Sequence, residues 1–153
     1  MAGTAEFSRD GRYRYALRRT WAAGPSMLWV LANPSSADAA NDDPTLRRCT
    51  RFAVDHGCGG LGVVNLWAWR ATDPRELDGV DDPVGPDNDR WITALSRQAD
   101  GPVVLGWGVQ TSPRVASVRQ LLGRRPTHCL GRTRAGHPRH PLYVSAETRL
   151  RPW

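Results

Sequence analysis

The sequence contains no lysine: all 21 basic residues are arginine, and with 15 acidic residues they leave a net charge of +6. A GC-rich coding bias would replace lysine by arginine throughout, whereas selection for the planar guanidinium group would favour arginine where phosphate is gripped. A chain without lysine cannot form the GxxxxGKS/T phosphate loop. The sequence therefore excludes a P-loop nucleoside triphosphatase.

Cysteine and long apolar runs are also scarce. Only Cys49, Cys58 and Cys129 are present, an odd number without CxxC spacing, so we expect reduced thiols and no disulfide framework. No apolar run approaches the roughly 20 residues that cross a bilayer, and residues 1–7 lack the basic-then-apolar layout of a secretory signal. These absences predict a soluble cytoplasmic protein with no membrane partner.

The length and apolar pattern predict a single α/β domain over residues 1–153. Short, almost continuously apolar runs are typical of parallel strands buried on both faces, and segments with helix-start signals alternate with them. The expected architecture is a three-layer α/β/α fold with a short, mainly parallel four-stranded sheet. The predicted strands are 27–31, 61–67, 103–107 and 127–130, and the predicted helices are 45–54, 90–95 and 112–122.

Two further structural predictions come from weaker patterns. Residues 12–21 show partial alternation of polar and apolar side chains, which indicates an N-terminal edge strand or hairpin before the turn at Gly24-Pro25. In the second predicted helix, Trp91, Ala94 and Leu95 are spaced to share one apolar face.

Polar residues follow the predicted strands directly. Ligands of parallel α/β sheets bind beyond the carboxyl ends of the strands, so these loops are the expected working surface. Asn33 could hold a water molecule or a base edge, although Asn33-Pro34 before two serines is equally an ordinary turn. Asn65 lies within an apolar strand, where an amide is costly unless it is hydrogen-bonded.

Aromatic and basic residues occupy the same loops. Trp67, Trp69 and Arg70 could form a stacking surface with a cation beside it, or the tryptophans could simply cap the core. Trp107 stands between two glycines, where the backbone can approach a ligand closely.

The loop over residues 131–143 carries two histidines and three arginines. Histidine can donate a proton or hydrogen bond to a developing anion, and arginine can hold phosphate. His137 and His140 with Cys129 or Cys58 would make an atypical zinc site, and our expectation is that no metal or cofactor is bound. Residues 114–151 hold nine arginines and one acidic residue, which suits a phosphate-bearing ligand or a solvated surface.

Seven short segments resemble the bacterial family catalogued as domain of unknown function sixteen-forty-three: Arg12–Tyr15, Leu31–Ser35, Asp43–Arg48, Val64–Leu66, Arg70–Pro74, Val84–Asp89 and His140–Tyr143. The family name implies no activity. More remotely, the order of Asn33-Pro34, Asn65-Leu66, Leu105-Gly106 and His140-Pro141 is similar to that in the uracil-DNA glycosylase superfamily. That resemblance implies cleavage of a base–sugar bond, with Asn33 placing a water molecule and His140 stabilising the departing base.

We therefore expect an N-glycosidase-like hydrolase acting on a nucleobase-containing ligand, which is a nucleoside, a nucleotide, DNA or RNA. The expected catalytic residues are Asn33, His140 and His137. The expected substrate-binding residues are Pro34, Ser35, Asp43, Asn65, Trp67, Trp69, Arg70, Trp107, Arg132, Arg134, Arg139 and Tyr143. Two alternatives stay open, a non-catalytic nucleotide or nucleic-acid binding module and a metal-dependent hydrolase.

Overall fold

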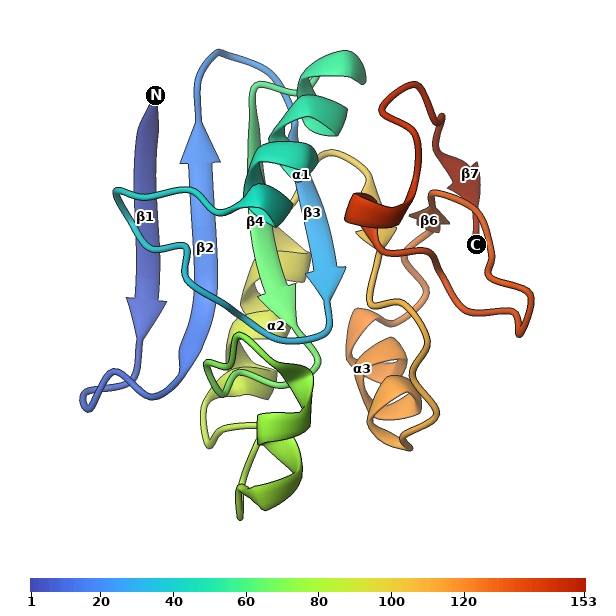
Figure 1. Ribbon diagram of the computed structural model, residues 1–153. Coiled ribbons are helices and arrows are strands. Elements are labelled where there is room, and N and C mark those ends of the chain that lie inside the picture. The colour runs from blue at the N-terminus through green and yellow to red at the C-terminus, as the bar shows by residue number, and fades with distance from the viewer.

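The computed structural model describes residues 1–153 and contains one seven-stranded mixed sheet flanked by helices (Figure 1). The strands lie in the spatial order β1-β2-β4-β3-β5-β6-β7. The strands are β1 (Ala2–Phe7), β2 (Arg14–Thr20), β3 (Ser26–Leu31), β4 (Gly60–Asn65), β5 (Val103–Leu105), β6 (Thr127–Cys129) and β7 (Arg151–Pro152). The α-helices are α1 (Pro44–Asp55), α2 (Asn88–Gln98) and α3 (Arg114–Leu122), and the 3-10 helices are η1 (Pro74–Gly79) and η2 (Pro141–Tyr143).

The α/β class is confirmed, and the four strands expected from their apolar runs form a parallel unit in the centre of the sheet. In this unit β4 pairs with β3, β3 with β5 and β5 with β6, all in parallel. The sheet is larger than predicted because β1, β2 and β7 extend it by antiparallel pairing. The N-terminal strand β2 is part of a hairpin, as one alternative predicted, but it is not an edge strand because β1 covers it.

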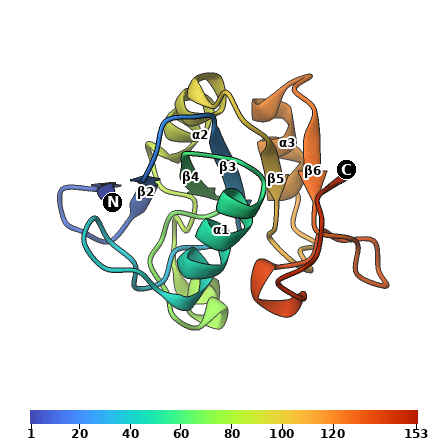
Figure 2. The ribbon, with the colours of Figure 1, turned by 90° about the horizontal axis from the view of Figure 1, so that it is seen from above.

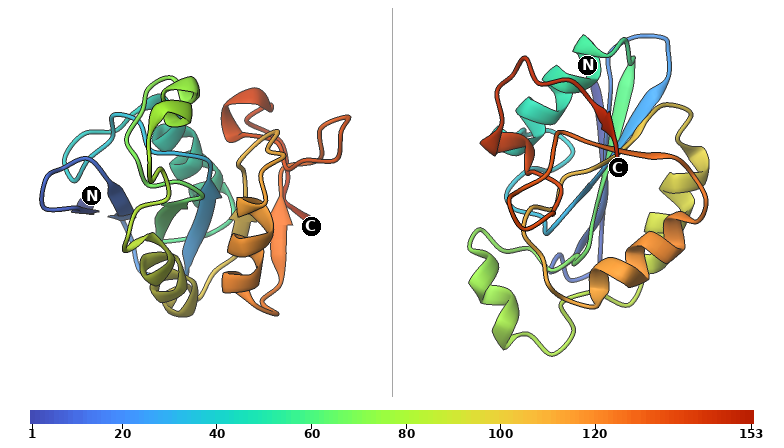
Figure 3. Two further views of the ribbon diagram at one scale, coloured as in Figure 1. Left: turned by 90° about the horizontal axis from the view of Figure 1, so that it is seen from below. Right: turned by 90° about the vertical axis from the view of Figure 1, so that its right-hand side faces the viewer.

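Helices cover both faces of the sheet (Figure 2). On one face, α1 packs its buried residues Leu46, Cys49 and Phe52 against a core that includes Trp29. On the other face, α2 and α3 enclose a second apolar core, and the edge-on view in Figure 3 separates these two helices from α1 and η2. No helix is both long and apolar enough to cross a bilayer.

The helix starts agree closely with the sequence signals, and the predicted apolar face of the second helix is correct in part. Helix α1 begins at Pro44, and the Asp43 carboxylate caps it by accepting a 2.8 Å hydrogen bond from the Leu46 amide. In α2, Leu95 is buried and the half-buried Trp91 packs against the same core, as their spacing predicts. Ala94 is half-buried outside that core, and the buried Ile92 takes its place on the face that meets the sheet.

The strand order places a topological switch point between β3 and β5. The chain leaves β3 through α1 to reach β4 on one side, and returns through α2 on the opposite face to reach β5 on the other side. Loops that follow β3 and β5 therefore diverge and leave a crevice at the carboxyl ends of these strands, which is where ligands bind in sheets of this kind.

Candidate functional site

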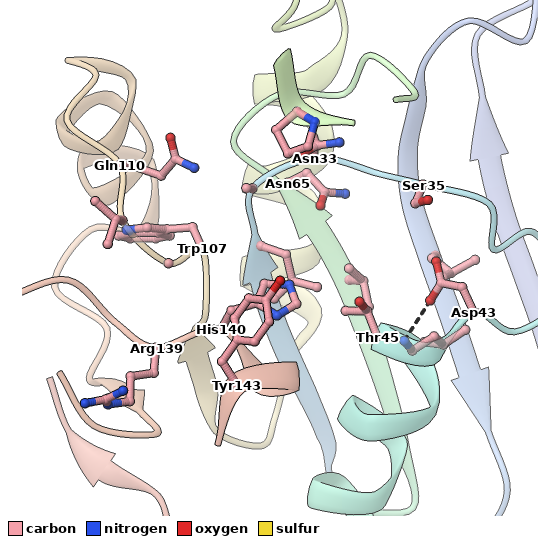
Figure 4. A pocket seen from close by; sticks show the side chains of 18 of the residues that line it. Asn33, Ser35, Asp43, Thr45, Asn65, Trp107, Gln110, Arg139, His140 and Tyr143 are labelled. Carbon is pink, nitrogen blue, oxygen red and sulfur yellow. Dashed lines mark hydrogen bonds between the residues drawn. The ribbon is translucent and has the colours of Figure 1, made fainter. Parts of the chain in front are cut away.

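A pocket of ≈ 370 Å³ opens at this switch point, within the size range of small-molecule sites (Figure 4). Its walls come from the loops after β3, β4 and β5, from the start of α1, and from the segment around η2. In Figure 4, Trp107, His140 and Tyr143 lie on one side, Ser35 and Asp43 on the other, and Asn33 and Asn65 between them. Eight predicted site residues line the pocket: Asn33, Ser35, Asp43, Asn65, Trp107, Arg139, His140 and Tyr143.

Asn65 is the most unusual polar group in the pocket. Its side chain is 1% exposed, and neither its carboxamide oxygen nor its nitrogen has a hydrogen-bond partner. The backbone around it is held firmly, since the Asn88 side chain donates hydrogen bonds to the carbonyls of Asn65 and Leu66 at 3.0 and 3.2 Å. A buried amide with a free donor and a free acceptor is costly unless a ligand satisfies it.

Asn33 has a fixed orientation. Its side-chain nitrogen donates to the backbone carbonyls of Pro34 and Ala71, at 3.2 and 2.9 Å. Because two carbonyl acceptors require the nitrogen at that position, the carboxamide oxygen is left as a free acceptor. The pair of backbone contacts thus presents one acceptor, suited to a water molecule or to an N–H group of a ligand.

His140 is held as a neutral hydrogen-bond donor. Its Nδ1 accepts a hydrogen bond from the Leu142 amide at 3.1 Å, so in the neutral ring the proton resides on Nε2. Burial lowers the pKa of His140, with an opposing effect from the Asp43 carboxylate. The exposed ring of Tyr143 lies 5.4 Å from the imidazole at the pocket.

Arg14 and Asp43 contribute charge to the pocket and both contact the backbone of Ala37. The Arg14 guanidinium donates to the Ala37 carbonyl at 2.9 Å, while the Asp43 carboxylate accepts from the Ala37 amide at 3.3 Å. Arg14 is 4% exposed and its Nε has no partner. Burial lowers the pKa of Arg14 to about 10, and the nearby Asp43 carboxylate works against that shift.

The loop after β5 supplies the wall around Trp107. Trp107 is buried in the core on the α2–α3 face of the sheet and also lines the pocket. His137 is not a lining residue; its Nδ1 accepts a 3.4 Å hydrogen bond from the Gln110 amide behind the wall. The His137 side chain therefore supports the loop that carries Gln110 rather than facing the pocket.

Six predicted substrate-binding residues also lie outside this pocket. Pro34 is buried beneath the loop after β3, and Trp67 lines a neighbouring cavity. Three others make intramolecular contacts: Trp69 packs edge-on against Tyr13, Arg70 lies over Phe7, and Arg132 lies 3.8 Å above the ring of Trp153. Arg134 is exposed in the 131–139 loop.

The residues considered as a zinc site do not come together. No group of three or more His, Cys, Asp or Glu side chains is arranged to hold a metal ion. Cys58 and Cys129 are both buried as free thiols, in the strands and turns of the sheet rather than in the pocket. His137 and His140 therefore act separately, one behind the pocket wall and one on it.

Four polar lining residues were missed from the sequence: Arg14, Thr45, Gln110 and Thr133. Arg14 did carry a signal, because it stands among the apolar residues of the run Tyr13–Leu17, where a charged side chain is unexpected. Thr45, Gln110 and Thr133 carried none, since polar residues are common at helix starts and in loops. Sequence alone could have found the first but not the other three.

The fold and pocket define an α/β protein with a candidate site at the carboxyl ends of its parallel strands. Residues 14–142 match the family model described as Protein of unknown function (DUF1643), and the chain belongs to that family. No curated protein and no solved structure gives a significant match. These comparisons give no support to the remote resemblance to the uracil-DNA glycosylase superfamily.

Proposed function

We propose that the pocket binds a nucleobase and that the protein hydrolyses the bond between that base and its sugar. The observation that carries the proposal is Asn65, a buried amide whose donor and acceptor are both unpaired in the pocket. The edge of a nucleobase presents N–H donors beside acceptors, which is the complement such an amide needs. Trp107 and Tyr143 add aromatic surface that suits a planar ring.

The hydrolysis needs one group that places the attacking water at the sugar and another that stabilises the departing base. Water forms a bond to the anomeric carbon while the carbon–nitrogen bond breaks, and the base departs with the bonding electron pair. The free oxygen of Asn33 accepts a hydrogen bond from the attacking water. The products are a sugar with a new hydroxyl group and the free base, which takes up the proton that the water has lost.

His140 supports the departure of the base. Its Nε2–H points a neutral donor toward charge that develops only as the bond breaks, and such preorganised donors stabilise transition states strongly. A neutral imidazole suits this role because its pKa is lowered by burial.

The test is base release measured by mass spectrometry across nucleosides, nucleotides, DNA and RNA. Asn33→Ala and His140→Ala should each lower kcat by at least about 100-fold, the usual effect of removing one such group. Arg97→Ala, an exposed change on α2 outside the pocket, is the matched control. Activity that survives both pocket substitutions would contradict these roles.

The pH profile gives an independent check on His140. Because its pKa lies below the ordinary value of 6.5, the ring is neutral above that pH, and kcat should fall only as acid takes the pH through the lowered pKa. The acid limb should be altered in His140→Asn. If no compound releases a base while tryptophan fluorescence still responds to nucleotides, the protein is a binding module instead.

A further inference from the structure

A second cavity, of ≈ 340 Å³, adjoins the pocket and shares part of its wall. Asn33, Pro74 and Gln110 line both cavities, so these three residues mark their common boundary. Figure 4 shows Asn33 and Gln110 at the same end of the first pocket. The two cavities are therefore adjacent, with Asn33 at their common boundary.

The lining of the second cavity differs chemically from that of the first. Trp67 supplies an aromatic wall, and the side chains of Thr111, Ser112 and Asp78 supply hydroxyl and carboxylate groups. Asp78 makes no ion pair within the chain, so both of its oxygens are free to accept hydrogen bonds. An aromatic face beside a carboxylate and hydroxyls suits a sugar ring, whose neighbouring hydroxyls a carboxylate binds in many nucleotide sites.

No basic residue lines the second cavity. The arginines near it in the sequence are already engaged. Arg70 lies over Phe7 and donates to the Gly11 carbonyl. Arg75 pairs with Asp73 at 2.7 Å. Arg114 donates to the Leu66 carbonyl and pairs with Asp89 at 2.6 Å. A phosphate group would meet the Asp78 carboxylate without a compensating cation, which is unfavourable.

We propose that the second cavity is the sugar subsite and that the substrate is a free ribonucleoside, rather than a nucleotide or a nucleic-acid strand. This inference rests on the proposed function. The base occupies the first pocket beside Asn65 and His140, the ribose lies on Trp67 with its hydroxyls toward Asp78, and the scissile bond crosses the boundary at Asn33. Asn33, which we assign to the attacking water, is one of the three residues that both cavities share.

The experiment compares adenosine, guanosine, cytidine and uridine with their free bases, 2′-deoxynucleosides, 5′-monophosphates and a single-stranded oligonucleotide. Base release gives kcat and KM, and calorimetry gives the dissociation constants. One ribonucleoside should be hydrolysed with a kcat/KM at least about tenfold above that of its monophosphate and that of its deoxy form. The deoxy form lacks the 2′-hydroxyl that Asp78 would bind, and the monophosphate brings a negative charge close to the Asp78 carboxylate.

Asp78→Asn is the diagnostic variant, and Asp81→Asn, an exposed carboxylate outside the cavity, is its matched control. Asp78→Asn should raise KM for the ribonucleoside about tenfold and leave the affinity for the free base unchanged, and Asp81→Asn should change neither. A preference for the monophosphate or the oligonucleotide, or equal behaviour of the two variants, would overturn the sugar subsite while leaving base release intact.

Absence of base release from every compound would instead defeat the proposed function. The subsite is then judged by calorimetry alone. A ribonucleoside must bind more tightly than its free base to the wild type, and Asp78→Asn must remove that difference. Equal affinities for nucleoside and base in the wild type would overturn the subsite as well.

Discussion

Asn65 and Asn88 are both almost completely buried, yet their side chains are held differently. The nitrogen of Asn88 donates two hydrogen bonds that hold the end of β4, and only its oxygen lacks a partner, whereas neither polar atom of the Asn65 side chain has one. A buried polar group without partners lowers the free energy of unfolding. Asn88 therefore contributes hydrogen bonds to the fold and Asn65 contributes none, which is why we assign Asn65 to the proposed base site.

This contrast gives a prediction from two matched substitutions. Asn65→Leu should raise the free energy of unfolding by about 1–3 kcal/mol, since it removes an unsatisfied amide at nearly constant volume. Asn88→Leu should lower it by a similar ~1–3 kcal/mol, because two carbonyls lose their donor. Urea unfolding measures both, and ligand binding by calorimetry should be lost in Asn65→Leu. Destabilisation by Asn65→Leu would show that its amide has partners in the folded protein.

At the scale of elements, Asp43 joins the start of α1 to the pocket. One oxygen caps the helix through the Leu46 amide, and the other accepts from the Ala37 amide, which fixes the loop after β3. The same side chain thus positions a helix, a loop and one wall of the pocket. Both contacts need an acceptor oxygen, and only a carboxylate offers two of them.

Asp43→Ala should therefore lower the free energy of unfolding by about 2 kcal/mol, because the N-cap and the acceptor of the Ala37 amide are both lost. Asp43→Asn keeps an acceptor for the Leu46 amide but leaves the Ala37 amide without one, so it should lower the free energy of unfolding by about 1 kcal/mol. Thermal unfolding at neutral pH distinguishes the two. Equal losses would mean that the carboxylate charge, facing the buried Arg14, contributes more to stability than the cap does.

The elements that could be predicted are those whose burial leaves a mark in the sequence. Strands buried on both faces, such as β3, show continuous apolar runs, and α1 is marked by its cap and Pro44. Strand β1 contains mostly small and polar residues, all of them half-buried or exposed, and β7 has only two residues. Each of these strands forms because a partner strand lies beside it. Such tertiary pairing leaves no local pattern.

The site was predictable to the same extent and for a related reason. Asn33, Asn65 and His140 were found because parallel strands bring their carboxyl ends to one edge of the sheet. Trp69 and Arg70 follow β4, the strand that ends at Asn65, but the loop turns away from the pocket and packs them against Tyr13 and Phe7. Position after a strand predicts a shared edge, whereas the path of the loop depends on contacts that sequence spacing does not contain.

At the scale of the whole molecule, the positive charge and the pocket are largely separate. The C-terminal third holds nine of the 21 arginines, yet Arg132 and Arg119 lie over Trp153 at 3.8 and 6.0 Å, and Arg114 pairs with Asp89. Of the arginines in this third, only Arg139 lines the pocket. The excess positive charge is thus divided between arginines that make contacts within the fold and arginines that are exposed to solvent.

This separation predicts how ligand binding responds to salt. A neutral ribonucleoside held by amides, aromatic rings and one carboxylate releases no counterions, so its dissociation constant should change less than about twofold between roughly 50 and 200 mM salt. A single nucleic-acid strand held by about seven or more arginines would lose affinity by roughly a thousandfold or more over that range. Calorimetry with the best ribonucleoside and with a single-stranded oligonucleotide measures both responses. Tight, steeply salt-dependent binding of the oligonucleotide would mean that the basic third is a phosphate-binding surface and that the pocket receives its base from a strand.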